Sequence, residues 1–260
     1  MADRNAQLRA ALTNARYPRS STYDPRWLID NLMGPHPLWL AESLTQAMPI
    51  EADMRVLDLG CGSALTSIFL AREFGAHVWA VDLWTPPTEN WKRIRAAGLA
   101  GQVHPIYADA RDLPFADEFF DAIVSFDAYH YFGTDVRYLP YCLKFLEPDG
   151  AIGAVSPGLR LEPGDPMPTY LSDRWNPDMC TYLSPHWWRT QWARTGLVDV
   201  ELADMIPGGW EDWLGWLDAC ALVGRGFAPD ARMLRADQGD LLGFTRIVAH
   251  RNRTQASVTV

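Results

Sequence analysis

The sequence has little cysteine and no excess of basic residues. Its 260 residues include four cysteines, none of them in a CxxC pair or at zinc-ligand spacing with histidine. We therefore expect neither a disulfide framework nor a metal site. The chain has 23 Lys and Arg against 32 Asp and Glu, a formal net charge of −9. Proteins that neutralise phosphates are usually basic, so no nucleic-acid partner is expected.

Long hydrophobic runs are also absent. No stretch of about 18 apolar residues occurs, so the sequence predicts no membrane-spanning helix and no membrane partner. The beginning of the chain, MADRNAQLRAALTNARYPRS, lacks the continuous apolar segment of a secretory signal peptide. We therefore expect a cytoplasmic protein. An apolar fraction of 48% excludes global disorder.

Tryptophan, by contrast, is abundant and unevenly distributed. Of the 12 tryptophans, seven lie between Trp175 and Trp216, and none lies between Lys92 and Arg174. Two interpretations stay open for the C-terminal cluster. The rings pack helices, or they form a pocket wall that accepts a flat or cationic substrate.

Apolar runs alternate with helical patterns along most of the chain. The expected strands are residues 54–59, 77–82, 103–107, 120–126, 151–155, 197–203 and 244–250. The expected helices are residues 4–15, 37–48, 63–74, 91–97, 135–146, 186–195 and 210–223. Strands of this kind, separated by helices, form parallel sheets covered on both faces, so we expect an α/β fold. Ser63 is a candidate N-cap, and Pro140 should kink its helix or delay its start.

The chain is expected to form a single domain, residues 1–260, in four parts. Residues 1–50 would form an N-terminal helical cover. Residues 54–156 contain the first five expected strands. Residues 157–196 are an aromatic-rich insertion with many prolines, and residues 197–251 contain the C-terminal strands and a helix.

The strongest motif is a glycine-rich turn after the first expected strand, VLDLGCGSA at residues 56–64. Gly60 and Gly62 let the backbone approach a ligand and turn tightly into a helix N-terminus. The dinucleotide fingerprint GxGxxG begins in the same way, but Leu65 occupies its third glycine position and is too bulky there. The pattern fits acidic-x-Gly-x-Gly-x-Gly instead, with Ala64 in the last position.

Acidic residues follow the next expected strands. Asp82 ends the second strand, where a carboxylate can accept hydrogen bonds from ribose hydroxyls. Asp109 follows the third strand, and the stretch SFDAYHYF, residues 125–132, includes the end of the fourth. Open α/β sheets bind ligands at the carboxyl ends of their strands, so we expect these positions to share one site.

These motifs resemble class I S-adenosylmethionine-dependent methyltransferases. Flanking stretches such as DLWTPPTENWKRIRAAG and SPHWWRTQWARTGLV resemble bacterial small-molecule methyltransferases loosely labelled cyclopropane-synthase-like. The resemblance implies a Rossmann-like sheet of seven mostly parallel strands, the last one antiparallel. It also implies S-adenosylmethionine as cofactor and S-adenosylhomocysteine as product. The methyl group would pass by in-line displacement to an N, O, S or C atom of a small molecule.

The resemblance also assigns site residues. Asp82 would bind the ribose, and Asp109 with the backbone N–H of Ala110 would bind the adenine. The other expected cofactor contacts are Asp58, Gly60, Gly62, Ser63, Leu83, Trp84, Asp127 and Tyr23.

The loop after the fourth strand would face the methyl group. His130 is the candidate general base, because histidine titrates near neutral pH. A structural histidine that bonds a backbone carbonyl is the alternative. Tyr129 is a candidate for donating a hydrogen bond. The expected substrate contacts are Tyr131, His36, His186, Trp187 and Trp188.

The tryptophan distribution favours an enclosed, aromatic-walled pocket on the substrate side. Two other functions stay open: methylation of a peptide or protein, and a non-catalytic protein that binds S-adenosylmethionine. The sequence does not predict the oligomeric state.

Overall fold

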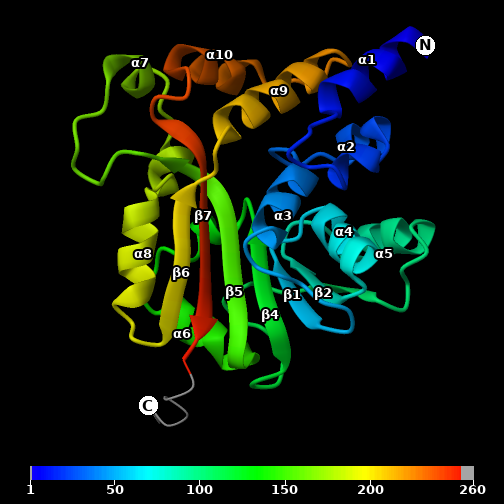
Figure 1. Cartoon of the computed structure of the whole chain (residues 1–260), viewed down its shortest axis with the longest axis vertical. Coiled ribbons are helices and arrows are strands. Elements are labelled where there is room, and N and C mark those ends of the chain that lie inside the picture. The colour runs from blue at the N-terminus through cyan, green and yellow to red at the C-terminus, as the bar shows by residue number, and fades with distance from the viewer. Residues whose placement is uncertain (1, 253–260) are drawn as a thin grey trace.

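A computed structural model of the chain describes residues 2–252 and contains a seven-stranded sheet in the order β3-β2-β1-β4-β5-β7-β6 (Figure 1). The strands are β1 (Arg55–Leu59), β2 (His77–Asp82), β3 (Val103–Tyr107), β4 (Phe120–Phe126), β5 (Leu146–Leu159), β6 (Val198–Met205) and β7 (Leu242–Arg251). Strands β1 to β5 run parallel, and β7 is antiparallel to both β5 and β6. This confirms the expected mostly parallel sheet with an antiparallel last strand.

Ten α-helices surround the sheet within residues 2–252. They are α1 (Ala2–Leu12), α2 (Pro25–Asp30), α3 (Pro37–Thr45), α4 (Leu65–Phe74), α5 (Pro87–Ala96), α6 (Tyr138–Cys142), α7 (Thr169–Ser172), α8 (Pro185–Ala193), α9 (Gly209–Ala221) and α10 (Ala228–Asp237). None of these helices is long and apolar enough to cross a membrane.

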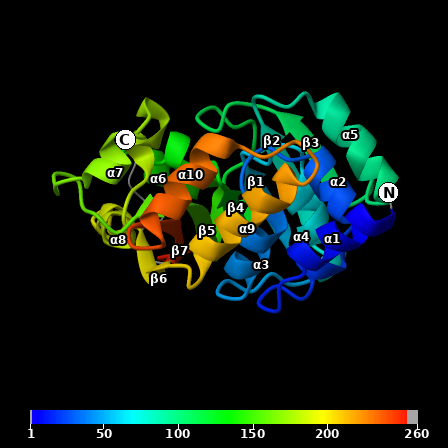
Figure 2. The same cartoon turned by 90° about the horizontal axis from the view of Figure 1, so that it is seen from above.

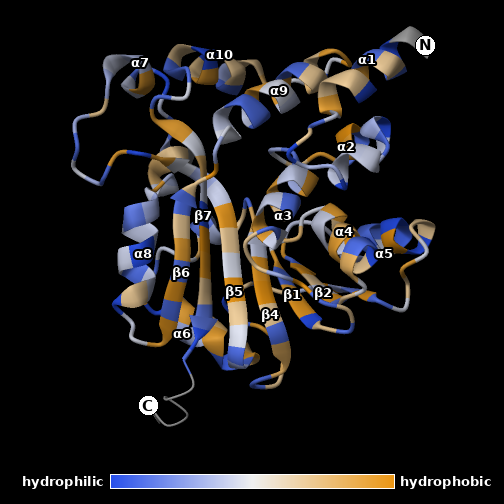
Figure 3. Cartoon of the chain, viewed as in Figure 1, coloured by the Kyte–Doolittle hydropathy of each residue, from blue (hydrophilic) through white to orange (hydrophobic). Residues whose placement is uncertain are grey.

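Two hydrophobic cores lie on the two faces of the sheet. Successive side chains of a strand point to opposite faces, and accordingly the neighbours Val56 and Leu57 of β1 belong to different cores. Helices α3 and α4 contribute to the core that contains Val56, and α6 and α8 contribute to the other. Figure 3 shows hydrophobic residues concentrated on the strands, whereas α5 is largely hydrophilic.

Most of the C-terminal tryptophans take part in these cores. Trp188 and Trp192 of α8 are buried in one core, and Trp213 and Trp216 of α9 are buried in the other. For these four rings the structure supports packing rather than a pocket wall. Their large apolar surface secures α8 and α9 to the sheet.

A row of helices lies across the edge of the sheet at which the parallel strands end. Figures 1 and 2 show α10, α9 and α1 side by side along this edge. An ion pair between Arg16 and Asp212, with 2.5 Å between Nη2 and Oδ1, joins the segment after α1 to α9. Asn14 donates to the same Asp212 oxygen at 2.7 Å. The N-terminal cover and the C-terminal helices therefore form one layer.

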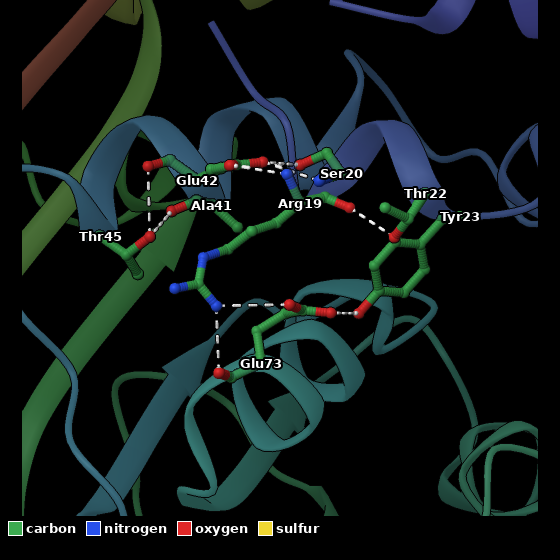
Figure 4. Close-up of polar contacts among 8 residues, drawn as sticks. All are labelled: Arg19, Ser20, Thr22, Tyr23, Ala41, Glu42, Thr45 and Glu73. Carbon is green, nitrogen blue, oxygen red and sulfur yellow. Dashed lines mark hydrogen bonds and ion pairs between the residues drawn. The ribbon is translucent and has the colours of Figure 1, made fainter. Parts of the chain in front are cut away.

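Two carboxylates hold the segment before α2 in place (Figure 4). Glu42 of α3 is buried and accepts hydrogen bonds from the backbone N–H groups of Arg19 (3.0 Å) and Ser20 (2.8 Å) and from the Ser20 hydroxyl (2.5 Å). Glu73 of α4 accepts from the Tyr23 hydroxyl at 3.0 Å and from the Arg19 guanidinium at 3.4 Å. These contacts attach the segment before α2 to both α3 and α4.

Two helices begin later than expected, for backbone reasons. The helix expected from Ser63 begins at Leu65, because Ala64 adopts a left-handed conformation (φ 58°, ψ 23°) and no side chain caps the helix. The helix expected over residues 135–146 is reduced to α6, which includes Pro140 in its first turn, followed by a 3-10 turn. Proline is tolerated in a first turn, where backbone N–H groups lack helical partners. Helices α2, α7 and α10 were not expected from the sequence.

Candidate functional site

A pocket with a cavity volume of about 240 Å³ opens at the carboxyl ends of the parallel strands. Its wall includes the turns at residues 60–63, 81–84, 108–111 and 126–128, which follow β1, β2, β3 and β4. The order β2-β1-β4 places the pocket beside the point where the direction of chain winding reverses. This switch point is the usual ligand site of open α/β sheets.

The glycine-rich turn brings bare backbone to the pocket. Gly60 and Gly62 have positive φ values of 72° and 52°. A Cβ atom on Gly60 would lie 2.3 Å from the Cβ of Ala128, and one on Gly62 would lie 3.0 Å from Sδ of Met33. A side chain at Gly60 would therefore clash with Ala128, whereas one at Gly62 would require Met33 to shift. Ser63 beside them also lines the pocket.

Asp58, an expected cofactor contact, is fully buried near the end of β1 and does not line the pocket. One carboxylate oxygen accepts from the hydroxyls of Thr66 and Ser67, both at 2.6 Å, whereas Oδ1 has no hydrogen-bond partner among the described residues. Burial raises the pKa of Asp58 to about 6, although the two hydroxyl hydrogen bonds act in the opposite direction. Asp58 therefore has one acceptor atom that the described part of the protein does not use.

Asp82 connects the end of β2 to the glycine-rich turn. Its Oδ2 accepts from the Gly62 N–H at 2.9 Å, and its Oδ1 accepts from the N–H groups of Trp84 (2.8 Å) and Thr85 (2.6 Å). Asp82, Leu83 and Trp84 all line the pocket. A carboxylate offers about four acceptor positions, so these three hydrogen bonds leave one for a ligand.

Asp109 and Ala110 form the next part of the wall, together with Arg111, which the sequence analysis did not single out. The Arg111 guanidinium lies 2.6 Å from Oδ2 of Asp109 and lowers the pKa of that carboxyl group. Asp127, at the end of β4, completes this series of acidic residues and also lines the pocket.

The two expected catalytic residues, Tyr129 and His130, do not line the pocket, whereas Tyr131 does. Tyr129 is 1% exposed and packs against Trp188 and Trp192. His130 is equally buried, and burial lowers its pKa to about 4. These residues form a 3-10 turn, in which three successive side chains point in three directions.

Other expected contacts also lie away from the pocket. The Tyr23 hydroxyl points to Glu73 (Figure 4), and His36 is buried at the start of α3. His186 is exposed at the start of α8. Trp187 packs edge-on against Trp188, with 4.9 Å between the ring centroids. The pocket wall includes no residue of the insertion, 157–196. Among the tryptophans, all of them in the described part of the chain, Trp84 alone lines it.

Sequence reasoning missed the wall formed by the connection between α2 and α3. Its pocket residues are Asn31, Met33, Gly34, Pro35, Pro37 and Leu40. The stretch MGPHP at residues 33–37 was a visible signal for a turn. It did not indicate that this turn lies over the ends of β1 and β4.

Comparisons with known proteins agree with this geometry. A family model described as a methyltransferase domain matches residues 56–150. Glycine/sarcosine/dimethylglycine N-methyltransferase of Actinopolyspora halophila is 28% identical over 157 residues, which are 60% of this chain and 27% of that protein. Methyltransferase GfsG of Streptomyces halstedii is 30% identical over 153 residues, which are 57% of this chain and 52% of that protein. The chain thus spans about a quarter to a half of the length of these two relatives.

Solved structures share the fold over most of the chain. Geranyl diphosphate C-methyltransferase of Streptomyces coelicolor A3(2) has a TM-score of 0.69 at 18% identity and covers 94% of this chain and 86% of its own. The [4+2]-cyclase SpnF has a TM-score of 0.67 at 17% identity, with coverage of 82% and 81%. The family match covers the glycine-rich turn and the acidic strand ends, so most of the pocket wall lies in the part of the chain that matches a methyltransferase domain.

Proposed function

We propose that this protein transfers a methyl group from S-adenosylmethionine to a small molecule. One observation carries the proposal: the glycine-rich turn, Asp82 and the Asp109–Ala110 turn meet in one pocket at the switch point of the sheet. The acceptor would enter the same pocket, near the end of β4.

The residues of the pocket suit this cofactor. Gly60 and Gly62 have no side chains, so the methionine portion can lie against their backbone. Asp82 keeps an acceptor position for a ribose hydroxyl, and Asp109 offers a carboxylate to the adenine amino group. When bound, S-adenosylmethionine supplies an electrophilic methyl group on its sulfonium.

The proposal assigns no proton transfer to His130. Its ring is buried outside the pocket, and a pKa near 4 makes it a weak proton acceptor at neutral pH. Relatives with this domain or fold include proteins named for methyl transfer to nitrogen and to carbon. The acceptor atom must therefore be inferred from the pocket itself.

The direct test is turnover. The protein is incubated with S-adenosylmethionine and panels of amines, thiols, phenols and carboxylic acids, and S-adenosylhomocysteine is measured by mass spectrometry. We expect product with at least one class of acceptor. The Asp82→Asn variant should lower the rate at subsaturating cofactor at least about tenfold, because it weakens a hydrogen bond to a charged group.

Asp112→Asn is the matched control, because Asp112 is an exposed carboxylate that does not line the pocket. It should leave the rate unchanged. Cofactor binding without product from any acceptor class would contradict methyl transfer and support a non-catalytic binding protein. Turnover is the necessary measurement, because the fold also occurs in a [4+2]-cyclase.

A further inference from the structure

Asp127 differs from the other carboxylates of the pocket wall. Asp82 accepts three backbone hydrogen bonds, and Asp109 is paired with Arg111. The Asp127 carboxylate has no hydrogen bond or ion pair to any residue of the described chain. Its backbone N–H donates to the carbonyl of Val155 at 2.8 Å, which anchors the residue to β5 while the carboxylate faces the pocket.

The local backbone holds this carboxylate at the pocket wall. Asp127 has a φ of 54°, a left-handed conformation that few residues other than glycine, asparagine and aspartate adopt readily. The carboxylate lies against Gly34, where a Cβ atom would be 2.3 Å from Oδ2 of Asp127. Any side chain at position 34 would therefore displace the carboxylate. Unusual backbone conformations of this kind cluster at functional sites.

No cation of the pocket wall neutralises Asp127. Arg111 is the basic side chain among the lining residues, and it is already paired with Asp109. Burial, with a further contribution from the negative charge of Asp230 on α10, raises the pKa of Asp127 to about 8. A partly buried carboxylate without a partner is costly, and a ligand with a positive charge would remove that cost.

The cofactor has its own candidate carboxylates. Asp82 and Asp109 line the pocket after β2 and β3, whereas Asp127 lines it after β4. Apolar side chains also line the pocket, among them Met33, Leu40 and Phe132. We propose that Asp127 binds the positively charged nitrogen of the methyl acceptor, and that this acceptor is an amine with an apolar body. The inference rests on the proposed function.

Binding measurements test the inference separately from turnover. The protein is first saturated with S-adenosylhomocysteine, as followed by calorimetry. Saturation-transfer NMR then measures the binding of ethanolamine, benzylamine and hexylamine, each compared with the alcohol that has the same carbon skeleton. We expect at least one amine to bind at least about tenfold more tightly than its alcohol. The Asp127→Asn variant should remove this preference and keep its affinity for S-adenosylhomocysteine.

Asparagine is the appropriate replacement, because it has nearly the same shape and tolerates the left-handed conformation. Asp230→Asn is the matched control. It removes a nearby negative charge from a residue outside the pocket wall and should keep the amine preference.

Three outcomes of the amine-binding measurements would overturn the inference: no preference for any amine, an unchanged preference in Asp127→Asn, or an equal loss in Asp230→Asn. Loss of S-adenosylhomocysteine binding in Asp127→Asn would also overturn it, because Asp127 would then serve the cofactor. If the unaltered protein fails to bind S-adenosylhomocysteine, it is the proposed function that fails.

Discussion

At the residue scale, the pocket depends on Gly60, where a positive φ and a close neighbour both disfavour a side chain. Gly98, outside the pocket wall, is a useful comparison. Gly60 and Gly98 both have positive φ values, 72° and 76°. A Cβ on Gly60 would collide with that of Ala128, whereas one on Gly98 would have no atom within 4 Å. The two glycines therefore separate the cost of backbone strain from the cost of a steric clash.

Replacing each of these glycines with alanine should give unequal losses of stability. Gly98→Ala should lower the free energy of unfolding by about 1 kcal/mol, because it adds only left-handed strain. Gly60→Ala should cost about 1–3 kcal/mol more, because the new methyl group overpacks the turn against Ala128. Urea denaturation of both variants checks this, and equal losses would show that the 2.3 Å approach imposes no constraint.

His36 illustrates how burial makes stability depend on pH. Its Nδ1 accepts from the Trp39 N–H at 3.2 Å, and its ring stacks on Trp39 and lies edge-on to Trp216. Burial lowers its pKa from 6.5 to about 3. Between these values the unfolded chain binds a proton at His36 and the folded chain does not. The contribution of His36 to the free energy of unfolding is therefore complete above pH 6.5 and declines as the pH falls.

The His36→Asn variant should show a weaker acid dependence of stability. Asparagine keeps an acceptor for the helix N-terminus but does not titrate. Between pH 4 and 6, the slope of unfolding free energy against pH should decrease by up to about 1.4 kcal/mol per pH unit. Denaturant unfolding at several pH values gives both slopes. Parallel curves for the two proteins would mean that His36 is protonated in the folded state.

At the scale of elements, the Glu42 contacts attach the N-terminal segment to α3. Glu42→Ala should lower the free energy of unfolding by about 2–4 kcal/mol, because it leaves the backbone N–H groups of Arg19 and Ser20 without their acceptor. Glu73→Ala is the comparison, because its ion pair with Arg19 is partly exposed and should contribute about 1 kcal/mol or less. Thermal and denaturant unfolding measure both. A larger loss in Glu73→Ala would assign the attachment to α4 instead.

The sequence predicted the strands better than the helices. Strands β1, β2 and β4 are short and mostly buried apolar runs, and their length and composition identify them. Strand β3 is also short, but Val103 is its only buried residue. Strand β5 extends beyond its expected range to Leu159, because β7 pairs with it past Val155, its last partner residue for β4. Helix α10 has only two large apolar residues, Met233 and Leu234, so its tertiary contacts with α9 and α7 identify it.

At the scale of the whole molecule, the sequence predicted the floor of the pocket but not its cover. The glycine-rich turn and Asp82 were recognisable, because each directly follows a strand and the strand ends share one edge. The wall around Gly34 comes from the loop between α2 and α3, which precedes all the strands in the sequence. No local pattern indicates where that loop lies relative to the sheet. The tryptophan cluster suggested a pocket wall, yet most of its rings fill the cores. Tryptophan is common both in cores and in pocket walls, so its abundance does not distinguish the two.

The central claim is that the pocket at the strand ends binds the cofactor, and one calorimetric titration tests it most directly. S-adenosylhomocysteine is titrated into the unaltered protein, Asp82→Asn and the surface control Asp112→Asn. We expect saturable one-to-one binding to the unaltered protein and the control, and an affinity at least about tenfold lower for Asp82→Asn. Absence of binding to the unaltered protein, or equal affinity in all three, would contradict the assignment of this pocket.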